Sequence, residues 1–334
     1  MDWTGQSAWL YDGSSTIRLG LLDVDHTRSS DGFHWSYVTH LTDSGYVAGW
    51  SRRFGPGDTA RARSRGFSTW LYDGSSTTRV GLFDVDHTRS DGDQFSHISH
   101  LTDSGYAAGT SNQRTGGRSA WFYDGSSATR IGDLDAVHTR STDGYQDSDV
   151  TRLTESGYAA GYSSRFDGEV SLGQTGWIYD PVADTQISII LSERSDGYAY
   201  SYVSFLGEDG LGLGSYVLFD AADANLGGRA FAWTPESGAV DLGALVAGGL
   251  SAAGWSALYG AIRENGLDQI VGGGILPTGG WLAYLLVPIP EPGTGVLVAL
   301  GLLGFAARPR TRHSAATPRK GPGLSPEVHT TEYS

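Results

Sequence analysis

The chain contains no cysteine, only one methionine, and charged side chains at just 18% of its positions. Without cysteine it can form neither disulfide bonds nor thiolate metal sites. This absence does not decide the cellular compartment, because a closed array of sheets needs no such cross-links. No window carries a sustained apolar stripe with the 3.6-residue period of an amphipathic helix. The missing features therefore favour a fold built from strands.

Three catalytic or phosphate-binding motifs are also missing. The sequence has no Gly-rich phosphate loop between a strand and a helix, no G-x-S-x-G and no H-E-x-x-H. The net charge is −14, and residues 308–334 carry +3, so the other 307 residues carry −17. Such an acidic body repels phosphate backbones, which argues against nucleic acid as a partner.

One sequence segment is repeated along the chain. A recurring tryptophan marks its copies at spacings of 61, 51 and 56 residues, and a recurring leucine follows at 60, 52 and 53: Trp9, Trp70, Trp121, Trp177; Leu41, Leu101, Leu153, Leu206. Because the two markers drift together, the copies are one structural unit whose surface loops vary in length.

Each copy has the sequence pattern of several short β-strands. In the second copy, apolar runs at 67–72, 78–82, 96–101 and 106–111 are separated by turns rich in Gly, Asp and Ser. This pattern predicts a four-stranded antiparallel meander, and such units typically stack as β-propeller blades. We expect an all-β, β-propeller-like array of five or six blades over residues 1–287. The chain opens and ends within a unit, so the terminal strands could share one blade; an open stack of meanders is the alternative.

The C-terminal region changes character after residue 287. Pro288, Pro290 and Pro292 predict a stiff spacer, and the 15 uncharged residues 293–307 predict a short transmembrane helix. Arginines follow at once, as in a stop-transfer signal with the repeats outside the cytoplasm. A buried core helix is the alternative. We divide the chain into the repeat domain, a segment at 288–312, and a disordered tail at 313–334.

Pro290-Glu291-Pro292, a short apolar segment and then Arg308, Arg310 and Arg312 resemble the PEP-CTERM sorting signal. This resemblance implies an exosortase as partner, anchoring in the membrane, and display or release at the cell envelope. The family usually ends soon after the arginines, whereas 22 residues follow here. The start, MDWTGQSAWL, shows no signal peptide and falls inside a repeat, so we expect a truncated or misassigned N-terminus.

The repeats resemble extracellular HAF-type repeats. The clearest match is Ala230-Phe231-Ala232-Trp233 followed by Val240-Asp241-Leu242-Gly243, with Ile270-Val271-Gly272 downstream. The first three copies depart from this pattern, with Trp-Leu-Tyr-Asp or Trp-Phe-Tyr-Asp at the start. The resemblance implies an extracellular repeat protein and no particular reaction.

Acidic loops are the candidate metal sites. They contain Asp23, Asp25 and His26; Asp84, Asp86 and His87; and, with what we interpret as an insertion, Asp133, Asp135 and His138. Further acids follow at Asp31, Asp91, Asp93 and Asp143. Such oxygen ligands suit Ca²⁺, although the spacing is not that of an EF-hand. A transition metal held through the histidines, or loop capping by Asp with the His packed or solvated, are the alternatives.

The acids of the LT(D/E)SGY turns, Asp43, Asp103 and Glu155, are interpreted as turn-initiating residues of their own turns. Paired carboxylates could also serve a glycoside hydrolase. However, these acids recur equivalently from copy to copy, which is typical of a scaffold.

Aromatic side chains at Trp9, Trp50, Trp70, Trp121, Tyr46, Tyr106 and Tyr158 could stack sugars or fill the space between sheets. We therefore expect a non-enzymatic surface protein without a cofactor, structural or adhesive, with polysaccharide as a possible ligand. A lectin and a glycoside hydrolase are the alternatives.

Overall fold

The computed structural model describes residues 5–55, 58–59, 64–263 and 269–287. In this part of the chain, strands predominate and the helical segments are three short 3₁₀ turns at Val85–His87 (η1), Ala136–His138 (η2) and Leu242–Leu245 (η3). The chain is therefore all-β where it is described, as the sequence predicts.

Four complete four-stranded antiparallel sheets follow one another along the chain. Their strands are β4 to β7 (His34–Leu41, Val47–Arg52, Gly66–Tyr72, Thr77–Val80), β8 to β11 (Gln94–Leu101, Ala107–Asn112, Gly117–Tyr123, Ala128–Ile131), β12 to β15 (Gln146–Leu153, Ala159–Asp167, Val170–Asp180, Thr185–Ile189) and β16 to β19 (Ala199–Leu206, Gly212–Phe219, Asn225–Thr234, Gly238–Asp241). Each sheet is a meander in which successive strands pair. Four-stranded antiparallel meanders are thus confirmed, but the predicted grouping of strands is wrong, because the strands predicted at 67–72 and 78–82 lie in one sheet and those at 96–101 and 106–111 lie in the next.

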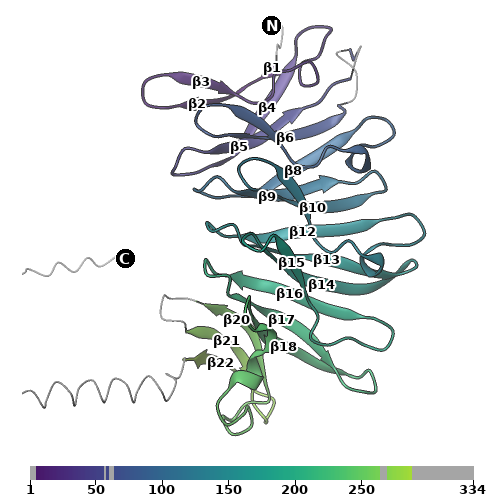
Figure 1. The fold of residues 1–334 in the computed structure, drawn as a ribbon, viewed down its shortest axis with the longest axis vertical. Helices are drawn as coiled ribbons and strands as arrows, with labels where there is room; N and C mark the ends of the chain where they lie inside the picture. Colours follow the sequence, from purple (N-terminus) through teal and green to yellow (C-terminus); the bar gives the residue numbers. More distant parts are fainter. Residues whose placement is uncertain (1–4, 56–57, 60–63, 264–268, 288–334) are drawn as a thin grey trace, which may run out of the picture. The chain divides into compact units, whose positions relative to one another are not determined.

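Incomplete sheets stand at both ends of this series. The first contains β2 (Ala8–Tyr11) and β3 (Thr16–Leu19), preceded along the chain by β1 (Gly5–Gln6), and the last contains β20 (Ala257–Arg263), β21 (Ile270–Ile275) and β22 (Trp281–Leu286). Strand β2 pairs with β3, and β22 pairs with β21. Among the described strands no pairing joins these two sheets, and they lie at opposite ends of the stack in Figure 1. The described strands thus form the open stack, and they do not make the shared blade that the repeat phase suggested.

Consecutive sheets are joined by short parallel pairings. The third strand of one sheet pairs with the first strand of the next over two residues, as in Gly66 with Gln94 and Phe67 with Phe95. The same link recurs between β1 and β4, β10 and β12, and β14 and β16. A Cβ on Gly66 would lie 1.7 Å from the Gln94 carbonyl oxygen, and its φ is +99°. Only glycine fits this position.

The core lies between the sheets and is built around the recurring tryptophans. Trp70, Trp121 and Trp177 are fully buried, and each belongs to a cluster shared with the preceding sheet. The packing role of these residues is confirmed. Trp9 is the exception at 64% exposure, because no described strand pairs with the free edge of β2.

Candidate functional site

In each acidic loop, the aspartate three residues before the histidine caps a 3₁₀ turn or bend. Asp84 Oδ1 accepts hydrogen bonds from the backbone N–H groups of Asp86 at 2.9 Å and His87 at 3.1 Å, and it lies 2.6 Å from His87 Nδ1. Asp135 and Asp23 make the same contacts in the third and first copies. Burial acts to raise the pKa of Asp84, but the His87 contact and the backbone N–H groups lower it. These three aspartates therefore cap their loops, which is the alternative to metal binding that the sequence suggested.

The insertion inferred in the third acidic loop is wrong. Asp135 and His138 have the same spacing as Asp84 and His87, so Asp133 occupies the place of Leu82. The backbone confirms this alignment, because the N–H of Asp133 donates to Ser163 Oγ as that of Leu82 donates to Ser111 Oγ. A carboxyl group therefore stands where the neighbouring copy has a core leucine.

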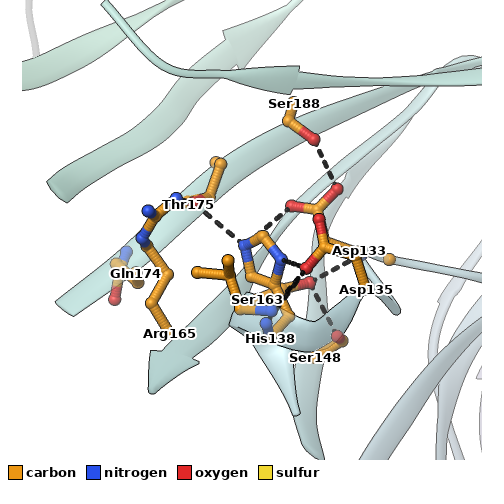
Figure 2. A network of polar contacts seen from close by, with 12 residues as sticks. Asp133, Asp135, His138, Ser148, Ser163, Arg165, Gln174, Thr175 and Ser188 are labelled. Carbon is orange, nitrogen blue, oxygen red and sulfur yellow. Dashed lines mark hydrogen bonds and ion pairs between the residues drawn. The ribbon is translucent and has the colours of Figure 1, made fainter. Parts of the chain in front are cut away.

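Figure 2 shows the polar network that surrounds this carboxyl group. Asp133 Oδ1 accepts hydrogen bonds from Gln186 Nε2 at 2.7 Å and from Ser188 Oγ at 2.5 Å. Its Oδ2 has no hydrogen-bond partner among the described residues and lies 3.5 Å from His138 Nε2. Burial raises the pKa of Asp133, because the ionised form is poorly solvated there.

The histidines of the acidic loops contact the next sheet. His87 Nε2 lies 2.8 Å from Ser119 Oγ on β10, and His138 Nε2 lies 3.1 Å from Thr175 Oγ1 on β14. In the first copy His26 Nε2 is buried and makes no such contact among the described residues. The sequence analysis missed this role, although a Ser or Thr recurs two residues before Trp70, Trp121 and Trp177.

Asp84, His87 and Ser119 have the connectivity of a carboxylate, a base and a nucleophile. His87 and Ser119 are nevertheless buried, at 2% and 1% exposure, so no substrate can reach the hydroxyl oxygen. Thr175 replaces the serine in the next copy. The arrangement fastens the second and third acidic loops to the sheets that follow them.

Three of the remaining predicted acids, Asp25, Asp31 and Asp143, contact arginines. Arg28 contacts both carboxylate oxygens of Asp31, at 2.8 and 2.6 Å, and Arg140 does the same with Asp143. The Arg140 hydrogen bond lowers the pKa of Asp143 to about 2. Asp25 lies 3.6 Å from Arg53. Within the described ranges, no group of three or more His, Asp and Glu residues could hold a metal ion. Calcium binding by the acidic loops stays an untested alternative to loop capping.

The acids of the LT(D/E)SGY turns bind the turn of the preceding sheet. Glu155 accepts hydrogen bonds from the backbone N–H groups of Asp103 at 3.0 Å and Ser104 at 2.9 Å. Asp103 likewise accepts from Ser44, and Glu208 accepts from Glu155 and Ser156. The prediction that Asp103 and Glu155 act within their own turns is therefore wrong. These carboxylates form a ladder between consecutive sheets.

Five aromatic rings in mutual contact cross from the first complete sheet to the second. Trp50 on β5 stacks on Tyr37 of β4 with ring centroids 5.8 Å apart, and it meets Phe67 of β6 edge-on at 4.7 Å. Phe67 contacts Phe95 of β8 at 5.9 Å, and Trp35 lies 6.4 Å from Trp50. We call Trp35, Tyr37, Trp50, Phe67 and Phe95 the aromatic groove.

A cavity of about 330 Å³ adjoins the aromatic groove. It is lined by Trp50, Phe67 and Phe95 and by the polar residues Ser96, His97, Thr110 and Asn112. Trp35 and Tyr37 are 37% and 51% exposed. Of the aromatic residues suggested by the sequence as sugar contacts, Trp50 lies here.

The other aromatic candidates lie elsewhere. Trp70 and Trp121 are buried. Tyr46, Tyr106 and Tyr158 cover glycines in the turn of the following sheet, namely Gly105, Gly157 and Gly210. These tyrosines pack between sheets.

Residues 288–310 match the family model for the PEP-CTERM protein-sorting motif. This motif implies processing by an exosortase and sorting to the cell surface. Pro290, Glu291, Pro292, Arg308, Arg310, Arg312 and the predicted helix at 293–307 lie outside the described residues. Within the described part of the chain, no helix is long and apolar enough to span a membrane. The HAF-type resemblance stays a prediction.

Comparison with curated proteins gave no match. Among solved structures, the chain is similar to a lectin of Aleuria aurantia in complex with Fucα1-6GlcNAc, with 12% identity, a TM-score of 0.25 and coverage of 70% of this chain and 69% of the lectin. A GH43 β-1,3-galactosidase is also 12% identical, with a TM-score of 0.28 and coverage of 68% and 81%. A Hadza microbial sialidase is 10% identical, with a TM-score of 0.33 and coverage of 75% and 57%. At these TM-scores the similarities carry no functional assignment.

Proposed function

We propose that this protein is a non-enzymatic, surface-displayed repeat protein with a structural or adhesive role in the extracellular matrix. The sorting motif at 288–310 carries this proposal, because it directs a protein to the cell surface. An exosortase is the partner that the motif implies, and residues 293–307 anchor the precursor in the membrane. Nucleic acid is not a partner, since the body is strongly acidic.

The arrangement of the acidic side chains supports a scaffold. An active site needs a few unlike groups around one substrate, whereas here Asp23, Asp84 and Asp135 make equivalent contacts in three successive copies. The ladder formed by Asp103, Glu155 and Glu208 likewise joins sheet to sheet. These contacts hold a long repetitive body together.

Display can be tested with the full chain joined to one export leader in a bacterium that carries an exosortase. Replacing Pro290, Glu291 and Pro292 by alanine should remove the protein from the surface, measured by antibody labelling of intact cells. The matched control is Pro318→Ala, which changes a proline outside the matched segment. Equal labelling of all three proteins would show that the motif does not direct display. Release of reducing sugar from a polysaccharide panel by the purified chain would overturn the non-enzymatic assignment.

A further inference from the structure

The second residue pair of each parallel link differs from sheet to sheet. The corresponding pairs are Gln6 with Trp35, Phe67 with Phe95, Arg118 with Asp147, and Gln174 with Tyr200. By contrast, the buried tryptophans and the loop caps recur almost unchanged. The repeated residues hold the sheets together. Residues that select one ligand over another are therefore expected among the side chains that vary from link to link.

We propose that the aromatic groove binds a neutral hexopyranose chain of an extracellular polysaccharide. This inference rests on the proposed function, which places the protein beside such polymers. A pyranose ring has apolar C–H faces and hydroxyl groups at its edge, so it requires flat aromatic surfaces with hydrogen-bonding groups beside them.

The groove supplies both kinds of contact. Trp35 and Tyr37 present exposed aromatic surface, and Trp50 packs against both. His97 and Asn112 line the adjoining cavity with donors and acceptors. A cavity of about 330 Å³ is at the lower end of the range of small-molecule sites, roughly 300–1,000 Å³.

The distribution of charge selects a neutral ligand. The cavity beside the groove is lined by no Lys, Arg, Asp or Glu, and the whole chain carries −14. At the next parallel link Arg118 is bound to Asp147 at 2.9 Å and to Asp149 at 2.8 Å. The acidic repeat domain would repel an acidic polysaccharide, and the positive charge of Arg118 is already balanced by Asp147 and Asp149.

Titration of the purified full chain tests the site. The probes are hexasaccharides of β-linked glucose, mannose or galactose, with a uronic acid hexasaccharide as the charged comparison, followed by tryptophan fluorescence and calorimetry. At least one neutral hexasaccharide should bind. Trp35→Ala and Tyr37→Ala should each weaken its binding about tenfold, which is the effect of losing one stacking contact.

Two variants separate binding from folding. Trp35→Phe should restore most of the affinity, because it keeps an aromatic face. Trp9→Ala should leave the affinity unchanged, because Trp9 is a more exposed tryptophan on another strand, at 64%.

The proposal is overturned if no neutral probe binds, if only the uronic acid probe binds, or if Trp9→Ala weakens binding as much as Trp35→Ala. Surface display is measured separately on intact cells. If the protein is displayed but binds no hexasaccharide, the binding proposal is wrong and the proposed function stands. If it binds a hexasaccharide but is not displayed, the proposed function is wrong and the binding proposal stands.

Discussion

Gly109 and Trp121 lie directly opposite each other on β9 and β10, and the Trp121 ring covers the glycine. A Cβ on Gly109 would lie 2.8 Å from the ring and 1.9 Å from the His97 carbonyl oxygen. Gly49 faces Trp70 and Gly161 faces Trp177 in the same way. The absent side chain is thus what allows each indole to lie flat on its sheet.

Gly109→Ala should lower the free energy of unfolding by about 3 kcal/mol, because a methyl group would force the ring and the strand apart. Urea denaturation of the full chain measures this loss. Gly273→Ala on β21 is the matched control, since its nearest neighbour is a Trp281 ring atom at 4.0 Å. Equal denaturation midpoints for Gly109→Ala and the original protein would contradict this account of the packing.

The strands could be predicted from the sequence because each is bounded by turn residues that act locally. The apolar run 281–286, for example, is the strand Trp281–Leu286. The environment of Trp9 could not be predicted in this way. Trp9 is followed by Leu10 and Tyr11 as Trp70 is by Leu71 and Tyr72, but it lacks the paired strand that covers Trp70, and that difference is a property of the assembled stack.

Glu155→Ala should cost about 1 kcal/mol of stability, because the backbone N–H groups of Asp103 and Ser104 would lose their acceptor. The loss is kept small by solvent, which can replace the carboxylate at this exposed turn. Thermal unfolding measures it against Glu169→Ala, which removes an exposed acid from a different turn. Identical midpoints for the two variants would contradict a stabilising role for the ladder.

The candidate site was only partly visible in the sequence. Trp50 was suggested as a sugar contact, but Trp35, Tyr37 and Phe95 were not. The β4–β5 pairing places Tyr37 opposite Trp50, whereas Phe95 comes from the next sheet and meets Phe67 through a two-residue parallel pairing. Such a short link leaves no periodic signal. The role of Glu155 was missed for a similar reason, since its partners lie 51 and 52 residues away.

Calcium should not change the thermal midpoint of the full chain when it is compared with a chelator. The carboxylate of Asp84 already accepts two backbone N–H groups and contacts His87, so binding a cation would require these contacts to be given up. Magnesium serves as the control for a general salt effect. A midpoint that rises with calcium and not with magnesium would instead support the acidic loops as a metal site, since a ligand bound only to the folded state stabilises it.

Asp133 should give the protein a pH-dependent stability that Asp133→Asn lacks. Burial raises the pKa of Asp133 above its ordinary value of 3.8, so the folded protein keeps this proton to higher pH than the unfolded chain. The contribution of Asp133 to stability is therefore fully present below pH 3.8 and is lost as the pH rises through the raised pKa. The asparagine side chain stays neutral, and its oxygen can still accept from Gln186 and Ser188.

The free energy of unfolding of Asp133→Asn, minus that of the original protein, should therefore increase from about pH 3.8 toward neutral pH. Its growth should be about 1.4 kcal/mol for each unit by which folding raises the pKa. The other titratable and charged groups near this carboxyl are Asp135, His138 and Arg165, and they are unchanged in the variant. Leu82→Asn is the matched control, because it introduces the same amide at the equivalent position of the preceding copy without removing a titrating group. Its difference from the original protein should not change with pH, and a constant difference for Asp133→Asn as well would show that the buried carboxyl does not titrate differently in the folded and unfolded states.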